Sequence, residues 1–286
     1  MRMTAGTDLQ KQIRQLVAAA LAEDHAEADA TSLAVVPENA VARASILARE
    51  TGVLSGCEYA ETAFVLCDPN LELSWLAHNG SKVESGQTVM SCEGSARAIL
   101  AAERTALNFL QQLSGVATLT AQAVMRAGSV KVLDTRKTVP GLRDAQKAAV
   151  VHGGGVNQRR DLQDELLLKE NHFALSGLSY AATVEKAVAE SQGRVVGIEA
   201  ETLEQAESAL AAGASYVLLD NFRGEELRAA IRILHAKFPQ AELEASGGFT
   251  VAQLPILEGT GVDRVSMGSL THSVSSLDLS LLLEAL

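Results

Sequence analysis

A repeated unit of one short apolar strand and one helix follows Gly128 and limits the folds open to this chain. The predicted strands cover residues 130–133, 165–168, 195–198, 216–219, 242–244 and 264–266. The predicted helices between the later strands cover 180–191, 203–212, 224–238 and 251–258. Alternating strands and helices predict a parallel sheet, and units of roughly 20 to 28 residues suit a barrel better than a doubly wound sheet. The number of units falls short of eight, so we predict an α/β fold whose larger part is an incomplete or irregular parallel α/β barrel.

The chain before Gly128 is patterned differently. Residues 8–23 place apolar side chains at helical spacing. Between about 40 and 94, short apolar segments are separated by turn signals such as Asn79-Gly80. This pattern predicts several antiparallel strands, with a helix over 60–66 packed on them.

Gly115 marks an expected boundary between helices and between domains. We predict one helix over 95–113 and a second over 116–127, separated by Gly115 and closed by Gly128. We accordingly expect an N-terminal domain over 1–114 and an α/β-barrel domain over 115–286. The extreme C-terminus can pack back on the N-terminal domain.

Composition argues for a cytoplasmic protein that does not enter a membrane. Hydrophobic residues make up 47% of the chain, yet no uninterrupted apolar run approaches the length needed to cross a bilayer. The first twelve residues lack the apolar core of an export signal. The three cysteines, Cys57, Cys67 and Cys92, are odd in number and lack CxxC spacing. We interpret them as reduced structural thiols, with no disulfide framework or metal site.

The charge distribution favours a small anionic ligand. The net charge of −11 argues against a nucleic-acid partner. Residues 130–172 nevertheless carry eight basic and six acidic side chains, so this stretch is +2 while the rest of the chain is −13. A bound anion explains this basic segment most simply, and a solvated run of surface charge is the alternative.

Chemically useful residues follow each predicted strand of the barrel half. In strand order, these residues are Thr135, Arg136 and Lys137; Lys169; Glu199; Asp220; Ser246, Gly247 and Gly248; and Met267, Gly268 and Ser269. Active sites of parallel barrels form where the carboxyl ends of the strands meet. The strand ends therefore predict one site.

The residue types indicate how that site would hold an anion. Arg136 and Arg159 offer planar guanidinium groups suited to two-point binding of carboxylate or phosphate. The two Gly/Ser segments can present backbone N–H groups to a phosphate. Glu199 and Asp220 could hold Mg²⁺ or face a cationic transition state.

Seven motifs, in order along the chain, resemble the quinolinate phosphoribosyltransferase family. They are ERTALNFLQQLSGVAT (103–118), DTRKTVPGLR (134–143), GGGVNQR (153–159), LLLKENH (166–172), LLDN (218–221), EASGG (244–248) and VSMGSLTHS (265–273). The resemblance covers nearly the whole chain and implies an N-terminal α/β sandwich domain over 1–114, an incomplete, about seven-stranded parallel α/β barrel as the catalytic domain over 115–286, and a homodimer. It implies NAD biosynthesis by transfer from phosphoribosyl pyrophosphate to quinolinate, giving nicotinate mononucleotide, pyrophosphate and carbon dioxide.

The resemblance also implies roles for individual residues. The dicarboxylate would be bound by Arg104, reaching across from the neighbouring subunit, with Arg136, Arg159 and Lys169. Thr135 would also contact substrate, and Lys137 would contact phosphoribosyl pyrophosphate. Glu199 and Asp220 would face the ribose and its Mg²⁺, and with Lys137 they form the expected catalytic group. Phosphate would be taken by Ser246, Gly247, Gly248, Met267, Gly268 and Ser269.

Four positions depart from the family pattern and keep alternatives open. Gln158 stands where the family usually has His, Ala148 where it has an aromatic residue, Val139 where Thr is common and Gly197 where Glu is frequent. Histidine can carry charge, whereas glutamine can only form hydrogen bonds. A paralogue acting on another aromatic acid therefore remains an alternative to a quinolinate enzyme.

Two further alternatives fit fewer residues. A non-catalytic ligand-binding paralogue would have little use for both Glu199 and Asp220. An aldolase-like barrel using Lys169 as a Schiff base would leave Arg104, Arg159 and the Gly/Ser segments unexplained. The motif around Lys169 favours the quinolinate enzyme.

Overall fold

The computed structural model describes residues 5–286, with side chains from residue 8 onward. The predicted first domain also includes residues 1–4, which lie outside the described residues. The chain forms two compact units. Of the described residues, 5–119, 151–153 and 274–286 form the first unit, and 120–150 and 154–273 form the second.

The first unit is built on a four-stranded antiparallel sheet in the order β12-β1-β5-β3. Its strands are β1 (Val41–Ala48), β3 (Glu72–Trp75), β5 (Thr88–Ser95) and β12 (Leu279–Ala285). A separate two-stranded ribbon pairs β2 (Gly52–Val53) with β4 (Lys82–Val83). The antiparallel strands predicted from the turn signals are therefore confirmed.

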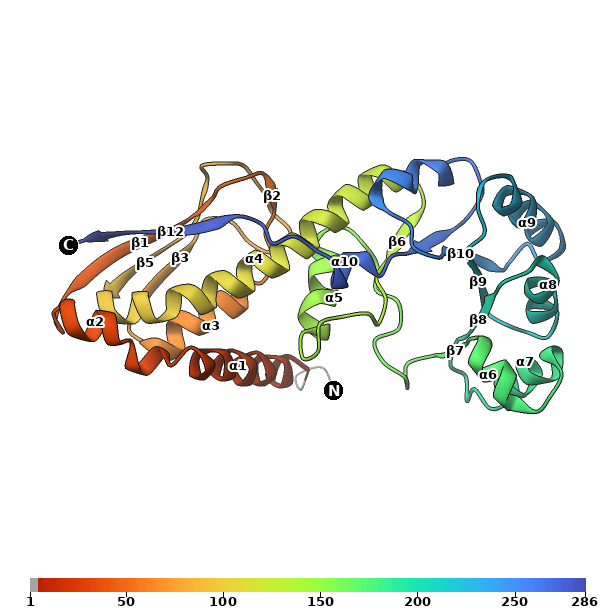
Figure 1. Ribbon diagram of the computed structural model, residues 1–286, viewed down its shortest axis with the longest axis horizontal. Helices are drawn as coiled ribbons and strands as arrows, with labels where there is room; N and C mark the ends of the chain where they lie inside the picture. Colours follow the sequence, from red (N-terminus) through yellow and green to blue (C-terminus); the bar gives the residue numbers. More distant parts are fainter. Residues whose placement is uncertain (1–4) are drawn as a thin grey trace. The chain divides into compact units, whose positions relative to one another are not determined.

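Helices accompany this sheet along one side (Figure 1). They are α1 (Ala5–Glu23), the short η1 (Ala26–Ala28), α2 (Ala30–Val35), α3 (Cys57–Cys67) and the first part of α4 (Ala96–Ala127). The helix predicted over 8–23 corresponds to α1, and the one predicted over 60–66 lies within the longer α3. Asp29 begins α2, where its side chain accepts from the backbone N–H groups of Thr31 and Ser32.

The C-terminal strand completes the antiparallel sheet. β12 runs antiparallel to β1, from the pair Ala48–Leu279 to the pair Ala42–Ala285. The Nε2 of Gln111, on α4, donates to the carbonyl of Leu279 over 2.6 Å. The final residues of the chain are therefore part of the first unit.

The prediction of two helices separated at Gly115 is wrong, because α4 runs unbroken from Ala96 to Ala127. Glycine weakens a helix interior without having to end it. Its function here is steric. A Cβ at residue 115 would lie 2.2 Å from the carbonyl oxygen of Ser275, so the chain leading to β12 can pass this close only to a glycine.

The second unit is a parallel sheet in the order β6-β11-β10-β9-β8-β7. Its strands are β6 (Lys131–Leu133), β7 (Leu166–Leu168), β8 (Val196–Ala200), β9 (Tyr216–Asp220), β10 (Glu242–Ser246) and β11 (Arg264–Ser266). Every pair is parallel, and β6 and β7 are the two edges. The predicted parallel architecture is confirmed.

The sheet has six strands, one fewer than the approximate number that the family resemblance implies, and a single parallel bridge joins Val156 to Leu133 beside β6. The segment around Val156 reads GGGVNQRRDLQD, whose glycines and charges offer no apolar alternation for a full strand.

Helices follow the strands of this unit. They are α5 (Arg143–His152), α6 (Glu170–Ser176), α7 (Tyr180–Ala189), α8 (Leu203–Ala211), α9 (Gly224–Lys237), η2 (Val251–Leu257) and α10 (Ser269–His272). α7, α8 and α9 lie outside the strands that they connect (Figure 1). The helix expected over 251–258 is a 3₁₀ helix that contains Pro255. Proline lacks the N–H group that an α-helix needs there.

No helix within residues 5–286 combines the length and the apolar character needed to cross a membrane.

We predict that Gly115→Ala destabilises the protein. Alanine gains about 0.5–1 kcal/mol of helix propensity, but its Cβ would clash with backbone at Ser275. Overpacking of this kind costs about 1–3 kcal/mol. Urea unfolding should show a net loss of stability, and a gain equal to the helix propensity would contradict this packing.

Candidate active site

A cavity of about 670 Å³ lies at the carboxyl ends of the parallel strands in the second unit. Twelve of the predicted site residues line it: Thr135, Arg136, Lys137, Arg159, Lys169, Glu199, Asp220, Ser246, Gly247, Gly248, Gly268 and Ser269. Arg159 follows α5 and the bridge residue Val156, and the others come from the end of a strand or from the segment directly after it, with every strand of the sheet contributing. The strand-end residues therefore do meet around one pocket, which we call the barrel pocket.

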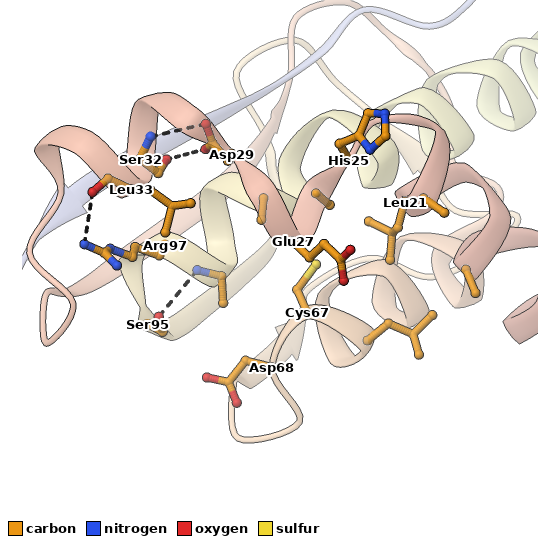
Figure 2. Close-up of a pocket in the computed structure, with 16 residues that line it drawn as sticks. Leu21, His25, Glu27, Asp29, Ser32, Leu33, Cys67, Asp68, Ser95 and Arg97 are labelled. Carbon is orange, nitrogen blue, oxygen red and sulfur yellow. Dashed lines mark hydrogen bonds between the residues drawn. The ribbon is translucent and has the colours of Figure 1, made fainter.

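The first unit contains a cavity of about 800 Å³ between its helices (Figure 2). Two of its polar side chains, Asp29 and Arg97, already have structural partners. Asp29 caps α2, and Arg97 donates to the backbone carbonyl of Val36 over 2.6 and 2.8 Å. Although this cavity is larger, it lacks the convergence of strand-end cations and carboxylates, so we assign the active site to the barrel pocket.

Two predicted site residues do not line the barrel pocket. Met267 is 2% exposed, and its backbone N–H donates to the carbonyl of Leu133 over 2.9 Å. That N–H group is therefore committed to the sheet, while Gly268 and Ser269 face the cavity. Arg104 is an exposed residue of α4 within the first unit.

One side of the pocket carries arginines whose positive charge is not balanced by a neighbouring carboxylate within the described chain. Among the described residues, neither Arg136 nor Arg159 has a carboxylate within ion-pairing distance, and the buried Nε of Arg136 has no hydrogen-bond partner. Burial lowers the pKa of Arg136, and the positive charges of Arg159 and Arg143 lower it further. Guanidinium groups held together without counterions form a binding site for an anion.

Glu199 and Asp220 form the acidic side, at the ends of β8 and β9. Lys169 forms an ion pair with Glu199, whose side chain is 14% exposed. Burial raises the pKa of Glu199, and the negative charge of Asp220 raises it further. The hydrogen bond and the positive charge of Lys169 lower this pKa and so act against both effects. The two carboxylates are therefore close enough to influence each other, and Lys169 balances one of them.

The two Gly/Ser segments line the cavity. Within the described chain, the N–H groups of Gly247, Gly248, Gly268 and Ser269 have no acceptor. Gly247 has φ +100°, and a Cβ there would lie 2.3 Å from Oδ1 of Asn221. Both facts require glycine at this position. Such N–H groups suit a phosphate.

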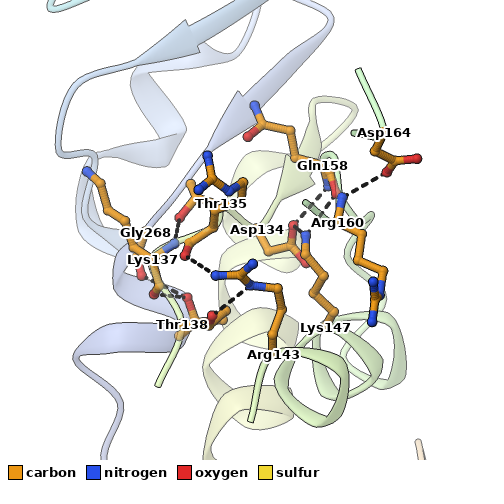
Figure 3. Close-up of polar contacts among 12 residues, drawn as sticks. Asp134, Thr135, Lys137, Thr138, Arg143, Lys147, Gln158, Arg160, Asp164 and Gly268 are labelled. Carbon is orange, nitrogen blue, oxygen red and sulfur yellow. Dashed lines mark hydrogen bonds and ion pairs between the residues drawn. The ribbon is translucent and has the colours of Figure 1, made fainter. Parts of the chain in front are cut away.

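A buried ion pair fixes the wall of the pocket that carries Gln158. Nζ of Lys147 lies 2.5 Å from Oδ1 of Asp134, and these side chains are 4% and 0% exposed. The backbone N–H of Gln158 donates to Asp134 over 2.9 Å, and its carbonyl accepts from Lys147 over 2.8 Å. The side chain of Gln158 extends away from this pair (Figure 3).

The four departures from the family pattern lie in different surroundings. Val139 and Ala148 do not line the pocket, whereas Gln158 does. Gly197 lies under the ring of Tyr216, where a Cβ would come within 2.2 Å of the ring carbon Cζ. The glycine therefore makes room for the tyrosine inside the barrel.

Several pocket residues were missing from the predicted site. They are Gln158, Leu167, Leu218, Phe249, Thr250, Ser266 and His272. Leu167 and Leu218 precede Lys169 and Asp220 by two residues, so strand alternation places each pair on one face. Ser266 ends a predicted strand, and this position alone is enough to predict that it lies at the pocket. The sequence holds no comparable signal for Phe249.

Comparisons with known proteins agree with these motifs. The chain matches the quinolinate phosphoribosyl transferase N-terminal domain over residues 29–114 and the C-terminal domain over 116–282. It is 38% identical to a probable nicotinate-nucleotide pyrophosphorylase (carboxylating) of Bacillus subtilis over 94% of this chain and 93% of that protein. It is also 38% identical to the corresponding Mycobacterium leprae protein, over 88% of this chain and 90% of that protein.

The fold agrees equally well. The structure of the nicotinate-nucleotide pyrophosphorylase from Francisella tularensis superimposes with a TM-score of 0.89 and 38% identity. The match covers 96% of this chain and 97% of that one. The resemblance seen in the motifs is therefore confirmed.

We predict that Lys147→Met costs about 3–5 kcal/mol of unfolding free energy, because it leaves the buried Asp134 carboxylate unpaired. Lys237→Met is the matched control, since Lys237 pairs with Glu207 at 2.6 Å while 54% exposed. Exposed pairs contribute at most about 1 kcal/mol. Equal losses in urea unfolding would contradict a structural role for the buried pair.

We further predict that Gly197→Ala costs about 1–3 kcal/mol, because its Cβ overlaps the ring of Tyr216. The Tyr216→Leu background provides the test, since removing the ring should remove most of that cost. Thermal unfolding of the single and double variants measures both values. An unchanged cost in the Leu background would show that the ring is not the obstacle.

Proposed function

The chain belongs to the quinolinate phosphoribosyl transferase family, and we propose that its barrel pocket joins quinolinate to the phosphoribosyl group of phosphoribosyl pyrophosphate. Pyrophosphate and carbon dioxide leave, and nicotinate mononucleotide is formed for NAD biosynthesis. The observation that carries this proposal is the pairing of uncompensated arginines with two carboxylates around one cavity. Quinolinate supplies the matching anion, and the developing ribosyl cation needs the carboxylates.

The basic side would bind the pyridine dicarboxylate. Arg136 and Arg159 can each take a carboxylate through two N–H groups, and Lys169 adds a compact charge beside them. We propose that Arg104 of a neighbouring copy completes this set in a homodimer, as the family resemblance implies. The exposed position of Arg104 supports such a role.

The other half would bind phosphoribosyl pyrophosphate. Lys137 follows β6 and has no carboxylate partner among the described residues. The free N–H groups of the two Gly/Ser segments suit the phosphates. Glu199 and Asp220 would then face the ribose.

The reaction needs positioning and electrostatics rather than a nucleophilic side chain. Cleavage of the bond between ribose carbon 1 and pyrophosphate leaves positive charge on the ribose, which Glu199 and Asp220 can stabilise. The quinolinate ring nitrogen donates its lone pair to carbon 1. The ring then carries positive charge, so it can accept the electron pair left when the 2-carboxylate departs as carbon dioxide. A proton replaces the carboxylate at that carbon.

We also propose that Mg²⁺ binds at Glu199 and Asp220. No group of three or more metal-ligating side chains occurs within residues 5–286. Mg²⁺ is usually held by one or two carboxylates together with substrate phosphates and waters, so this pair fits. When bound, the ion would neutralise charge on the pyrophosphate.

We propose a cytoplasmic location. The described cysteines Cys57, Cys67 and Cys92 are free thiols. Burial raises the pKa of the Cys57 thiol to about 12 and that of Cys92 to about 11. Unreactive free thiols suit a reducing compartment.

A paralogous enzyme acting on another aromatic acid is the second candidate. The neutral Gln158 in the pocket wall is the observation that favours it. Purified protein should be mixed with phosphoribosyl pyrophosphate, Mg²⁺ and quinolinate, and nicotinate mononucleotide measured by chromatography. Formation of the mononucleotide supports the quinolinate enzyme. Bound phosphoribosyl pyrophosphate without product would favour the second candidate.

We predict that Arg159→Ala raises the KM for quinolinate about 10- to 100-fold, as expected for loss of a charged hydrogen-bond donor, with little change in the KM for phosphoribosyl pyrophosphate. Arg160→Ala is the matched control, because Arg160 is exposed and already pairs with Asp144 and Asp161 at 2.7 and 2.9 Å. Steady-state kinetics with each substrate varied gives both constants. Equal effects of the two substitutions would refute the role of Arg159.

A further inference from the structure

The carboxamide of Gln158 is held from outside the pocket. Its Nε2 donates to Oε1 of Glu244 over 2.8 Å. Glu244 lies on β10 and is 0% exposed. Since a carboxylate can only accept, this contact assigns the NH₂ group of Gln158 to Glu244. One N–H of that group and the carbonyl oxygen remain for the cavity that Gln158 lines.

Glu244 is itself paired with a cation, although the two nearest atoms, Nε of Arg264 and Oε2 of Glu244, do not have the geometry of a hydrogen bond. Nε of Arg264 lies 2.9 Å from Oε2 of Glu244, and Nη1 of Arg264 lies 2.5 Å from Oε2 of Glu242. Burial raises the pKa of Glu244, while the charge of Arg264 and hydrogen bonds from Ser266 and Gln158 oppose this. Arg264 is thus anchored to two carboxylates of one strand, and only Glu244 touches Gln158.

An aromatic ring limits the movement of Arg264. Its guanidinium carbon lies 4.1 Å from the ring centre of Tyr216. The hydroxyl of Tyr216 donates to Glu165 over 2.8 Å. Gly197 leaves the space that this ring fills. One series of contacts therefore runs from Gly197 through Tyr216, Arg264 and Glu244 to the pocket wall at Gln158.

We propose that Glu244 is a positioning residue that acts through Gln158 and helps to set the affinity of the pocket for its aromatic acid. It fixes an uncharged carboxamide, with one N–H and one oxygen, where the acid binds. Charge compensation of the acid is left to Arg136, Arg159 and Lys169. This inference rests on the proposed function, because it concerns the quinolinate half of the same pocket.

The test compares Glu244→Met with Glu242→Met. Both substitutions remove a carboxylate that pairs with Arg264, but only the first removes the acceptor of Gln158. Methionine is used because a glutamine would keep a carbonyl oxygen that can accept from Gln158. We expect Glu244→Met to raise the KM for quinolinate about 3- to 10-fold, as for one misplaced hydrogen bond. Glu242→Met should leave it within about twofold, and neither should change the KM for phosphoribosyl pyrophosphate.

A double-variant cycle separates positioning from simple support of the fold. Gln158→Ala should raise the KM for quinolinate to a similar extent, and adding Glu244→Met should change it no further. Additive effects, or a Glu244→Met variant that loses only stability or kcat, would overturn the inference.

A second variant covers the case in which Glu244→Met does not fold. Gln158→Asn keeps an amide at this position but is one methylene too short to reach Glu244. We expect its KM for quinolinate to match that of Gln158→Ala, and a wild-type KM would overturn the inference. Wild-type protein without turnover would instead contradict the proposed function, and the inference with it.

Discussion

The parallel pairing of the six strands from β6 to β11 is the constraint on which the barrel pocket depends. Because all six run in one direction, their carboxyl ends share an edge of the sheet. Side chains separated by more than 100 residues, such as Arg136 and Ser269, therefore line the same cavity. Each strand need only place one or two groups at its end, and the sheet brings them together.

Charge balance then divides the cavity into two halves. Arg136 and Arg159 lack carboxylate partners within the described chain, whereas Glu199 is matched by Lys169. An enzyme that binds a dicarboxylate and develops a ribosyl cation needs both conditions in one place. The buried Asp134–Lys147 pair stabilises one wall of this cavity, since both of its side chains form hydrogen bonds with the backbone of Gln158.

Strand ends could be predicted from the sequence because short apolar segments followed by polar residues have few other interpretations. Lys169 and Asp220 were found in this way, and alternation along the strand would also have given Leu167 and Leu218. Features that depend on distant packing could not be predicted. Gly115 suggested a helix boundary, but the approach of Ser275 explains it. Likewise, nothing local in the sequence shows that Gly197 accommodates Tyr216, or that Glu244 holds Gln158.

Carbon dioxide release tests the central claim most directly, because it reports bond cleavage in the aromatic acid itself. Quinolinate labelled in its 2-carboxylate should be incubated with phosphoribosyl pyrophosphate, Mg²⁺ and the protein. The account predicts one labelled carbon dioxide for each pyrophosphate formed, and none when phosphoribosyl pyrophosphate is omitted. Pyrophosphate formed without labelled carbon dioxide, or label released without phosphoribosyl pyrophosphate, would contradict it.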